Sequence, residues 1–313
     1  MPTRRRRRWR SAVLGPSERF LPVGEPPLPV VEGRVVDAGP DLLVLWAPAG
    51  SGVGHREYRV PMSDETSVWY GGRAGREALQ PGRDAVVRPT GDGLAADRIW
   101  VDIVRVNGTI LSVAQKRERQ GLRHLVEVDQ GPHRPHVRVA IPPESLGKIL
   151  VRHPLMLPGQ LFDVIARQTW EGPVAVQPGS AQPAPLAAPP PGPEKGVLRG
   201  TATWYSTPGR GAAYPRLEAL GDSGGCPDAP DPCAQLPYLS LGSAVEVRND
   251  CTGRGADLDV IECGCNAALF CDRCVVCGTT PRGRLVELTR ASFVELGGDL
   301  DVGCFNVSLA VNR

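Results

Sequence analysis

The chain has 313 residues, 41% of them hydrophobic, and a formal net charge of +2. That length predicts two or three compact units, and the charge balance excludes a protein covered by one strongly basic or acidic field. High glycine (37) and proline (32) with 5% aromatic residues favour short strands joined by turns, so we expect an all-β protein. No apolar run approaches the roughly 20 residues of a membrane-spanning helix, so no membrane span is predicted.

Residues 1–28 are interpreted as a basic disordered tail. Arg4 to Arg8 form an unbroken basic run, but only Ala12, Val13 and Leu14 follow as an apolar stretch. A secretory signal needs roughly 7 to 15 apolar residues, so no recognisable signal peptide is predicted. The run favours a solvated tail over a nucleic-acid contact.

Two segments that follow repeat one pattern of short alternating strands, namely residues 29–104 and 105–176. Gly33 and Gly108 are 75 positions apart, and Gly82 and Gly159 are 77 apart. Two anchors with nearly one period indicate an internal duplication. Each copy is predicted to be a small OB-like barrel. The copies lack the interleaved aromatic and basic residues of a nucleic-acid platform, so we expect them to contact assembly partners.

Histidine is confined to this half of the chain. His133 and His136 flank Arg134 and Pro135, but two histidines without a neighbouring cysteine or acidic cluster leave a metal shell incomplete. We interpret them as loop residues. A Pro/Ala-rich linker follows at residues 177–195; its composition predicts an extended spacer between two independently folded parts.

Residues 196–313 carry motifs with specific spacing. They are Gly200-Thr-Ala-Thr-Trp204-Tyr205-Ser206, Leu241-Gly-Ser-Ala-Val245-Glu-Val247-Arg-Asn249, Leu258-Asp-Val260-Ile-Glu262 and Leu285-Val-Glu287-Leu-Thr289. This pattern resembles the double-psi β-barrel of the rare lipoprotein A (RlpA-like) and expansin-related family. The resemblance implies a third barrel, with Glu262 on the position of the family's catalytic aspartate.

The resemblance implies an extracytoplasmic or particle-associated protein that binds cell-wall glycan of the peptidoglycan kind. Under it, Glu262 is the candidate acid of a lytic transglycosylase-type cleavage and Glu287 its assistant, while Trp204 and Tyr205 could stack on sugar rings. The chain departs from the family because Leu236 occupies the position of its histidine. Two alternatives therefore stay open: a structural or assembly protein of a virion or envelope complex, and a zinc-stabilised interaction module.

The cysteines all follow the linker, in a density that indicates disulfides or a metal. They are Cys226, Cys233, Cys251, Cys263, Cys265, Cys271, Cys274, Cys277 and Cys304. We expect disulfides and no cofactor. The alternative is zinc bound by Cys263, Cys265, Cys271, Cys274 and Cys277, whose close spacing is typical of thiolate sites.

Overall fold

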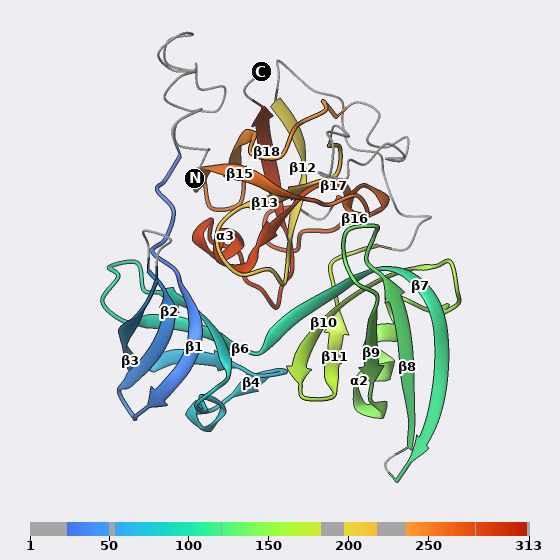
Figure 1. The fold of residues 1–313 in the computed structure, drawn as a ribbon, viewed down its shortest axis with the longest axis horizontal. Coiled ribbons are helices and arrows are strands. Elements are labelled where there is room, and N and C mark those ends of the chain that lie inside the picture. The colour runs from blue at the N-terminus through green and yellow to red at the C-terminus, as the bar shows by residue number, and fades with distance from the viewer. Residues whose placement is uncertain are drawn as a thin grey trace.

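The computed structural model describes residues 24–49, 54–119, 121–182, 197–217, 236–278 and 280–311. These residues are nearly all β. Their strands form closed β-sheets, or barrels, which we call rings and which pack against one another (Figure 1). The predicted all-β class is therefore confirmed. No helix in the described segments has the length and apolar character needed to cross a membrane.

The first ring, module 1, lies at the lower left in Figure 1. Its strands are β1 (Val31–Ala38), β2 (Leu42–Pro48), β3 (His55–Trp69), β4 (Arg73–Ala74), β5 (Asp84–Pro89) and β6 (Ala96–Val101). The ring runs β1-β2-β3-β6-β5 and closes between β5 and β1, while β4 lies outside it on β3. The pair β3–β6 is parallel and the other ring pairs are antiparallel. A 3-10 turn, η1 (Arg76–Ala78), precedes β5.

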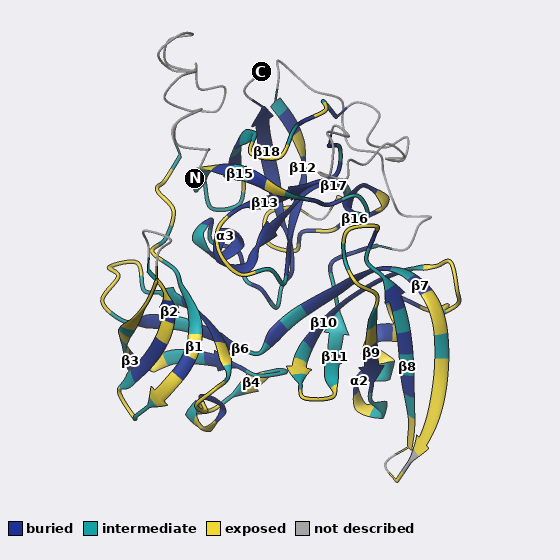
Figure 2. Ribbon diagram, in the orientation of Figure 1, coloured by how far each residue is buried: buried dark blue, intermediate teal, exposed yellow. Residues whose placement is uncertain are grey.

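The second ring, module 2, repeats this order. Its elements are β7 (Ile103–Glu118), β8 (Gly121–Asp129), β9 (Val137–Ile141), α2 (Pro143–Leu150), β10 (Leu161–Thr169) and β11 (Gly172–Pro178). The ring runs β7-β8-β9-β11-β10, and its one parallel pair, β9–β11, corresponds to β3–β6. The long strands β7 and β8 reach beyond the core, where Figure 2 shows exposed residues.

The glycine anchors of the predicted duplication occupy equivalent places in the two rings. Gly82 and Gly159 both have φ +85°, in the left-handed region that glycine tolerates best. Gly82 precedes β5 and Gly159 precedes β10, which take the same place in their rings. The Gly82 N–H donates to Val35 O and the Gly159 N–H to Ile110 O, both at 2.8 Å. The structure therefore agrees with the duplication that the sequence predicts.

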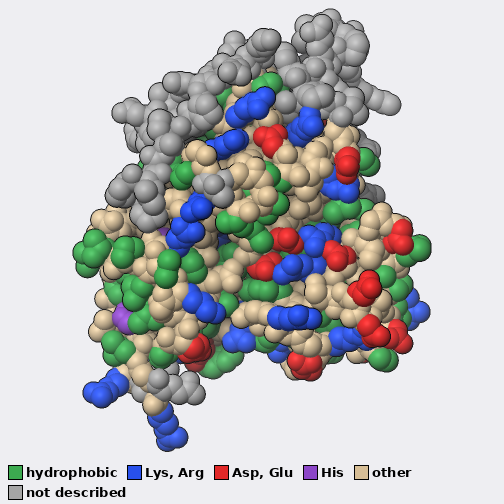
Figure 3. Space-filling model, turned by 180° about the vertical axis from the view of Figure 1, so that it is seen from behind, with side chains coloured by type: hydrophobic (Ala, Val, Ile, Leu, Met, Phe, Trp, Pro, Cys, Tyr) green, Lys and Arg blue, Asp and Glu red, His purple; other side chains and the backbone are tan. Residues whose placement is uncertain are grey.

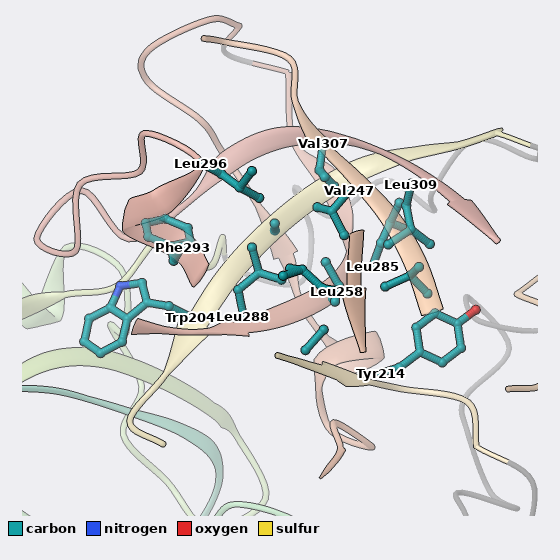
Figure 4. Close-up of a cluster of buried hydrophobic side chains, with 14 of the residues drawn as sticks. Trp204, Tyr214, Val247, Leu258, Leu285, Leu288, Phe293, Leu296, Val307 and Leu309 are labelled. Atoms are coloured by element: carbon teal, nitrogen blue, oxygen red, sulfur yellow. The ribbon is translucent and has the colours of Figure 1, made fainter. Parts of the chain in front are cut away.

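The C-terminal ring contains β12 (Val197–Tyr205), β13 (Ala212–Tyr214), β14 (Ala244–Asn249), β15 (Gly255–Cys263), β17 (Arg282–Thr289) and β18 (Phe305–Val311). The ring order is β12-β18-β14-β15-β13-β17, and β12 pairs with β17 to close it. The short strand β16 (Cys271–Asp272) lies outside on β17, and η5 (Ala267–Leu269) precedes it. Helix α3 (Arg290–Glu295) begins where the Thr289 side chain accepts the Ser292 N–H. Figure 4 shows the apolar core of the C-terminal ring, with Phe293 and Trp204 at one end.

One apolar core joins the three rings. Trp100 of module 1 and Ile103 and Ile165 of module 2 belong to the same buried cluster as Trp204 of the C-terminal ring. The indole of Trp100 also donates to Asp301 at 2.8 Å. This differs from the two independent parts expected from the linker, because linker composition does not reveal which barrel faces are complementary.

The predicted linker overlaps the second ring. Gln177 and Pro178 are the last residues of β11, and Ala181 forms a bridge with Asp272. Residues 183–196 lie outside the described part of the chain.

On the rear face, Lys/Arg and Asp/Glu side chains are interspersed (Figure 3), in line with the net charge of +2.

Candidate functional site

The two predicted acids lie on either side of one short strand. Ala213 of β13 pairs with Glu262 of β15 on one edge and with Glu287 of β17 on the other. The register of β13 against β15 shifts here, so that Ile261 has no partner and is exposed. The Glu262 side chain is 24% exposed, whereas that of Glu287 is 2% exposed. The structure thus places Glu262 and Glu287 together, as the resemblance implies.

A single arginine from module 2 lies between these acids. Arg134 belongs to the loop between β8 and β9, residues 130–136, which we call the β8–β9 loop. Its Nε donates to Glu262 Oε1 at 2.5 Å, and its Nη1 donates to Glu287 Oε2 at 2.8 Å. Its guanidinium carbon lies 4.5 Å from the centre of the Tyr205 ring. The β8–β9 loop therefore covers the acid pair and Tyr205.

The charge state of this site follows from its pairing. Burial favours the neutral acid, but Arg134 and Arg284 hold the pKa of Glu287 below its ordinary value. Burial likewise opposes the charge on Arg134, yet Glu287 and Glu262 raise its pKa. Glu287 also accepts from Asn107 Nδ2. It is therefore a fixed carboxylate with no proton to donate near neutral pH.

Further buried charges continue from Glu287 into the interface between module 2 and the C-terminal ring. Asp163 of β10 accepts from Arg105 Nη2 at 2.6 Å and from Arg284 Nη2 at 3.1 Å. Arg284 Nη2 also donates to Asp272 at 2.8 Å. The side chains of all four have no exposed surface. Since unpaired buried charges are costly, this network requires the two rings to stay together.

Sequence reasoning missed this network and Arg134. The available signal was a charge inside an apolar strand: Arg105 stands between Val104 and Val106, and Asp163 stands between Phe162 and Val164. Such a residue marks a buried pair, because isolated charges are rarely buried. Nothing in the strand pattern indicates which partner it meets.

The aromatic residues predicted to stack on sugars are not accessible. Trp204 has no exposed surface, and its Nε1 donates to Leu300 O at 2.9 Å. Tyr205 is buried beneath Arg134. Leu236, at the position of the family's histidine, is a core residue. The predicted stacking on sugars is therefore wrong in this structure, because the side chains of Trp204 and Tyr205 are both packed in the interior.

Among the described residues, cysteines form disulfides in two places, as expected. Cys263 pairs with Cys265 directly after Glu262, and Cys251 pairs with Cys277. Cys271 is buried in β16. Cys226 and Cys233 lie outside the described residues.

The ligand set considered for zinc does not come together. Cys263 and Cys265 lie beside His133 of the β8–β9 loop, within 4.8 Å sulfur to nitrogen, whereas Cys274 and Cys277 lie beside Cys251. The zinc site predicted from close spacing is therefore wrong. Cysteines that are near one another in sequence belong to two separate groups, one beside His133 and one beside Cys251.

No protein-family model matches this chain, and no curated protein matches its sequence. The resemblance to the rare lipoprotein A family thus remains an inference from the motifs.

Proposed function

We propose that this protein is a non-catalytic assembly protein, in which the C-terminal ring is a scaffold and its acid pair fixes module 2. The observation that carries the proposal is the bridge from Arg134 to both Glu262 and Glu287. Glycosidic cleavage needs an acid that can give a proton to the bond being broken. Here one carboxylate is buried and ionised, and the other is held by the arginine that covers it.

The surroundings of the acid pair support the same proposal. An aromatic ring binds a sugar only when its face is open, and Trp204 and Tyr205 are both buried. The Cys263–Cys265 disulfide lies beside His133, and Asn266 Nδ2 donates to Asp129 O at 3.4 Å. The cysteine-rich segment after Glu262 therefore packs against the end of β8 and the β8–β9 loop.

The test incubates the full chain with purified peptidoglycan. We expect neither release of soluble fragments nor sedimentation of the protein with the polymer. Thermal unfolding should show that Arg134→Ala is less stable than wild type, while the Arg138→Ala substitution, at an exposed position of β9, leaves the stability unchanged. Fragment release by the wild-type protein would overturn the proposal.

A second candidate is a glycan-binding or lytic barrel that the β8–β9 loop inhibits. The observation in its favour is that Glu262 keeps 24% of its side chain exposed and is covered by a loop, not by a strand. Under this candidate Arg134→Ala gains peptidoglycan binding or cleavage. Adding Glu262→Gln then abolishes cleavage but leaves binding. If Arg134→Ala is folded and gains neither, the scaffold proposal stands and the inhibited enzyme is excluded.

A further inference from the structure

Four cysteines from three segments of the chain lie at one end of the C-terminal ring. Cys251 follows β14, Cys274 and Cys277 lie in the loop between β16 and β17, and Cys304 precedes β18. We call these four residues the cysteine cluster. β14 and β18 are paired, with Asn249 opposite Val307, so the ends that carry Cys251 and Cys304 are held together by the sheet.

The sulfurs of Cys251, Cys274 and Cys277 lie within 4.8 Å of one another, close enough to bind one metal ion. Cys274 Sγ lies 3.6 Å from Cys251 Sγ and 3.9 Å from Cys277 Sγ. Cys304 lies outside that group, but the pairing of β18 with β14 holds it at the same end of the ring, where its thiol interacts with that of Cys274. With zinc–sulfur bonds of about 2.3 Å, two sulfurs of a tetrahedral site lie about 3.8 Å apart. These two separations lie on either side of that value, whereas Cys251 and Cys277 are bonded to one another and must separate before both can bind a metal.

The backbone around Cys274 fits the same chemistry. The Val276 N–H points at Cys274 Sγ, with nitrogen 3.4 Å from sulfur. Amide donors of this kind orient a thiolate ligand and offset its charge. The side chains of Val275 and Val276 point outward and are each 63% exposed. Apolar packing of these two side chains therefore does not hold the loop. Cys274 is buried, and the exposed Cys277 is held by its bond to Cys251.

We propose that the cysteine cluster, in its reduced form, binds one Zn²⁺ through four thiolates. In the structure Cys251 and Cys277 are joined as a disulfide. A dithiol reductant supplies the two electrons and two protons that open this bond, and is itself oxidised to a disulfide. The four thiols then release four protons as they bind the metal. Oxidation and zinc binding are thus alternative ways to fix the same loop.

This ligand set differs from the one that close spacing suggests. It keeps the Cys274-x-x-Cys277 pair and adds Cys251 and Cys304, which are distant in sequence. Cys263 and Cys265 are excluded because they belong to a separate group, beside His133 of the β8–β9 loop. Tetrathiolate coordination selects zinc over hard cations such as Mg²⁺ and Ca²⁺.

The test purifies the full chain under a thiol-free reductant with zinc present, removes unbound metal, and counts bound metal by native mass spectrometry. We expect one zinc per chain. Cys251→Ser and Cys304→Ser should each weaken zinc retention against a competing chelator at least tenfold. Cys265→Ser is the matched control in the same domain and should retain zinc as the wild type does.

A second measurement keeps the proposal testable if a variant fails to fold. Co²⁺ added to the reduced wild-type chain should give the intense visible and thiolate charge-transfer absorption of a tetrahedral sulfur site, and Zn²⁺ should displace it. Reduced protein that is folded but binds no Zn²⁺ or Co²⁺ would overturn the proposal. Equal metal loss in Cys265→Ser and Cys304→Ser would overturn the ligand assignment.

Discussion

Arg134 and Glu287 are 153 residues apart and belong to different rings, yet Arg134 Nη1 lies 2.8 Å from Glu287 Oε2. The contact turns a candidate catalytic acid into part of an interface. It also joins the acid pair to the buried charges of Arg284 and Asp163. Four predictions follow from this arrangement and from the core around it.

Replacing Arg134 should destabilise the protein strongly. Arg134→Met keeps much of the side-chain volume but leaves Glu262 and Glu287 without their shared cation. Breaking a buried pair in this way costs about 3 kcal/mol or more. Urea denaturation measures the change in the free energy of unfolding. Arg138→Met, at a solvent-facing position of the next strand, is the control and should shift it by about 0.5 kcal/mol or less. Equal effects of the two substitutions would contradict the bridge.

Stability should fall as pH is lowered below the ordinary carboxylate range. The pKa of Glu287 is held below its ordinary value by Arg134 and Arg284 against burial, and that of Asp163 by Arg105 and Arg284. A carboxyl whose pKa is lower when folded contributes stability above its unfolded pKa, near 4, and loses it as pH falls through the folded value. Unfolding midpoints in urea between pH 7 and pH 2.5 should show this decline.

The control for the pH prediction is Asp163→Asn, which removes one of these groups without changing its shape. Its free energy of unfolding should be lower at pH 7, and the decline with acid should be shallower than in wild type. A decline of the same size in both proteins would exclude Asp163 as a contributor.

Cutting the chain between the second and third rings should not separate them. A protease site placed within residues 183–196 would give two fragments, but the shared apolar core and the pairing of Asp163 with Arg284 should keep them together. Size-exclusion chromatography should show one peak that contains both fragments. Fragments that elute apart and each unfold cooperatively would instead support independent domains.

Trp204 should matter for folding and not for ligand contact. Trp204→Ala removes a fully buried indole and should lower the free energy of unfolding by about 3–5 kcal/mol. Trp204→Phe fills most of the space but leaves Leu300 O without its donor, so a loss of about 1–3 kcal/mol is expected. Trp170→Ala, at a residue 93% exposed, should be close to neutral by thermal unfolding.

The local features of this protein were determined by its sequence alone. Alternating strands and frequent turns predict an all-β chain, because side-chain direction along a strand depends only on neighbouring residues. The period between Gly82 and Gly159 predicts the repeated ring, since both positions need a left-handed backbone that glycine tolerates. The cysteine-rich segment predicts cross-linking, because a high density of cysteines is visible in the sequence itself.

The pairings on which the proposed function rests came only from the tertiary structure. Arg134 stands in an ordinary-looking loop, and its partners Glu262 and Glu287 are brought near it only when β13 inserts between β15 and β17. Likewise Cys304 lies at the same end of the ring as Cys251 only because β18 pairs with β14. Charge pairs and sulfur clusters form between segments far apart in the chain, so their partners depend on how the rings close and pack, which local sequence patterns do not encode.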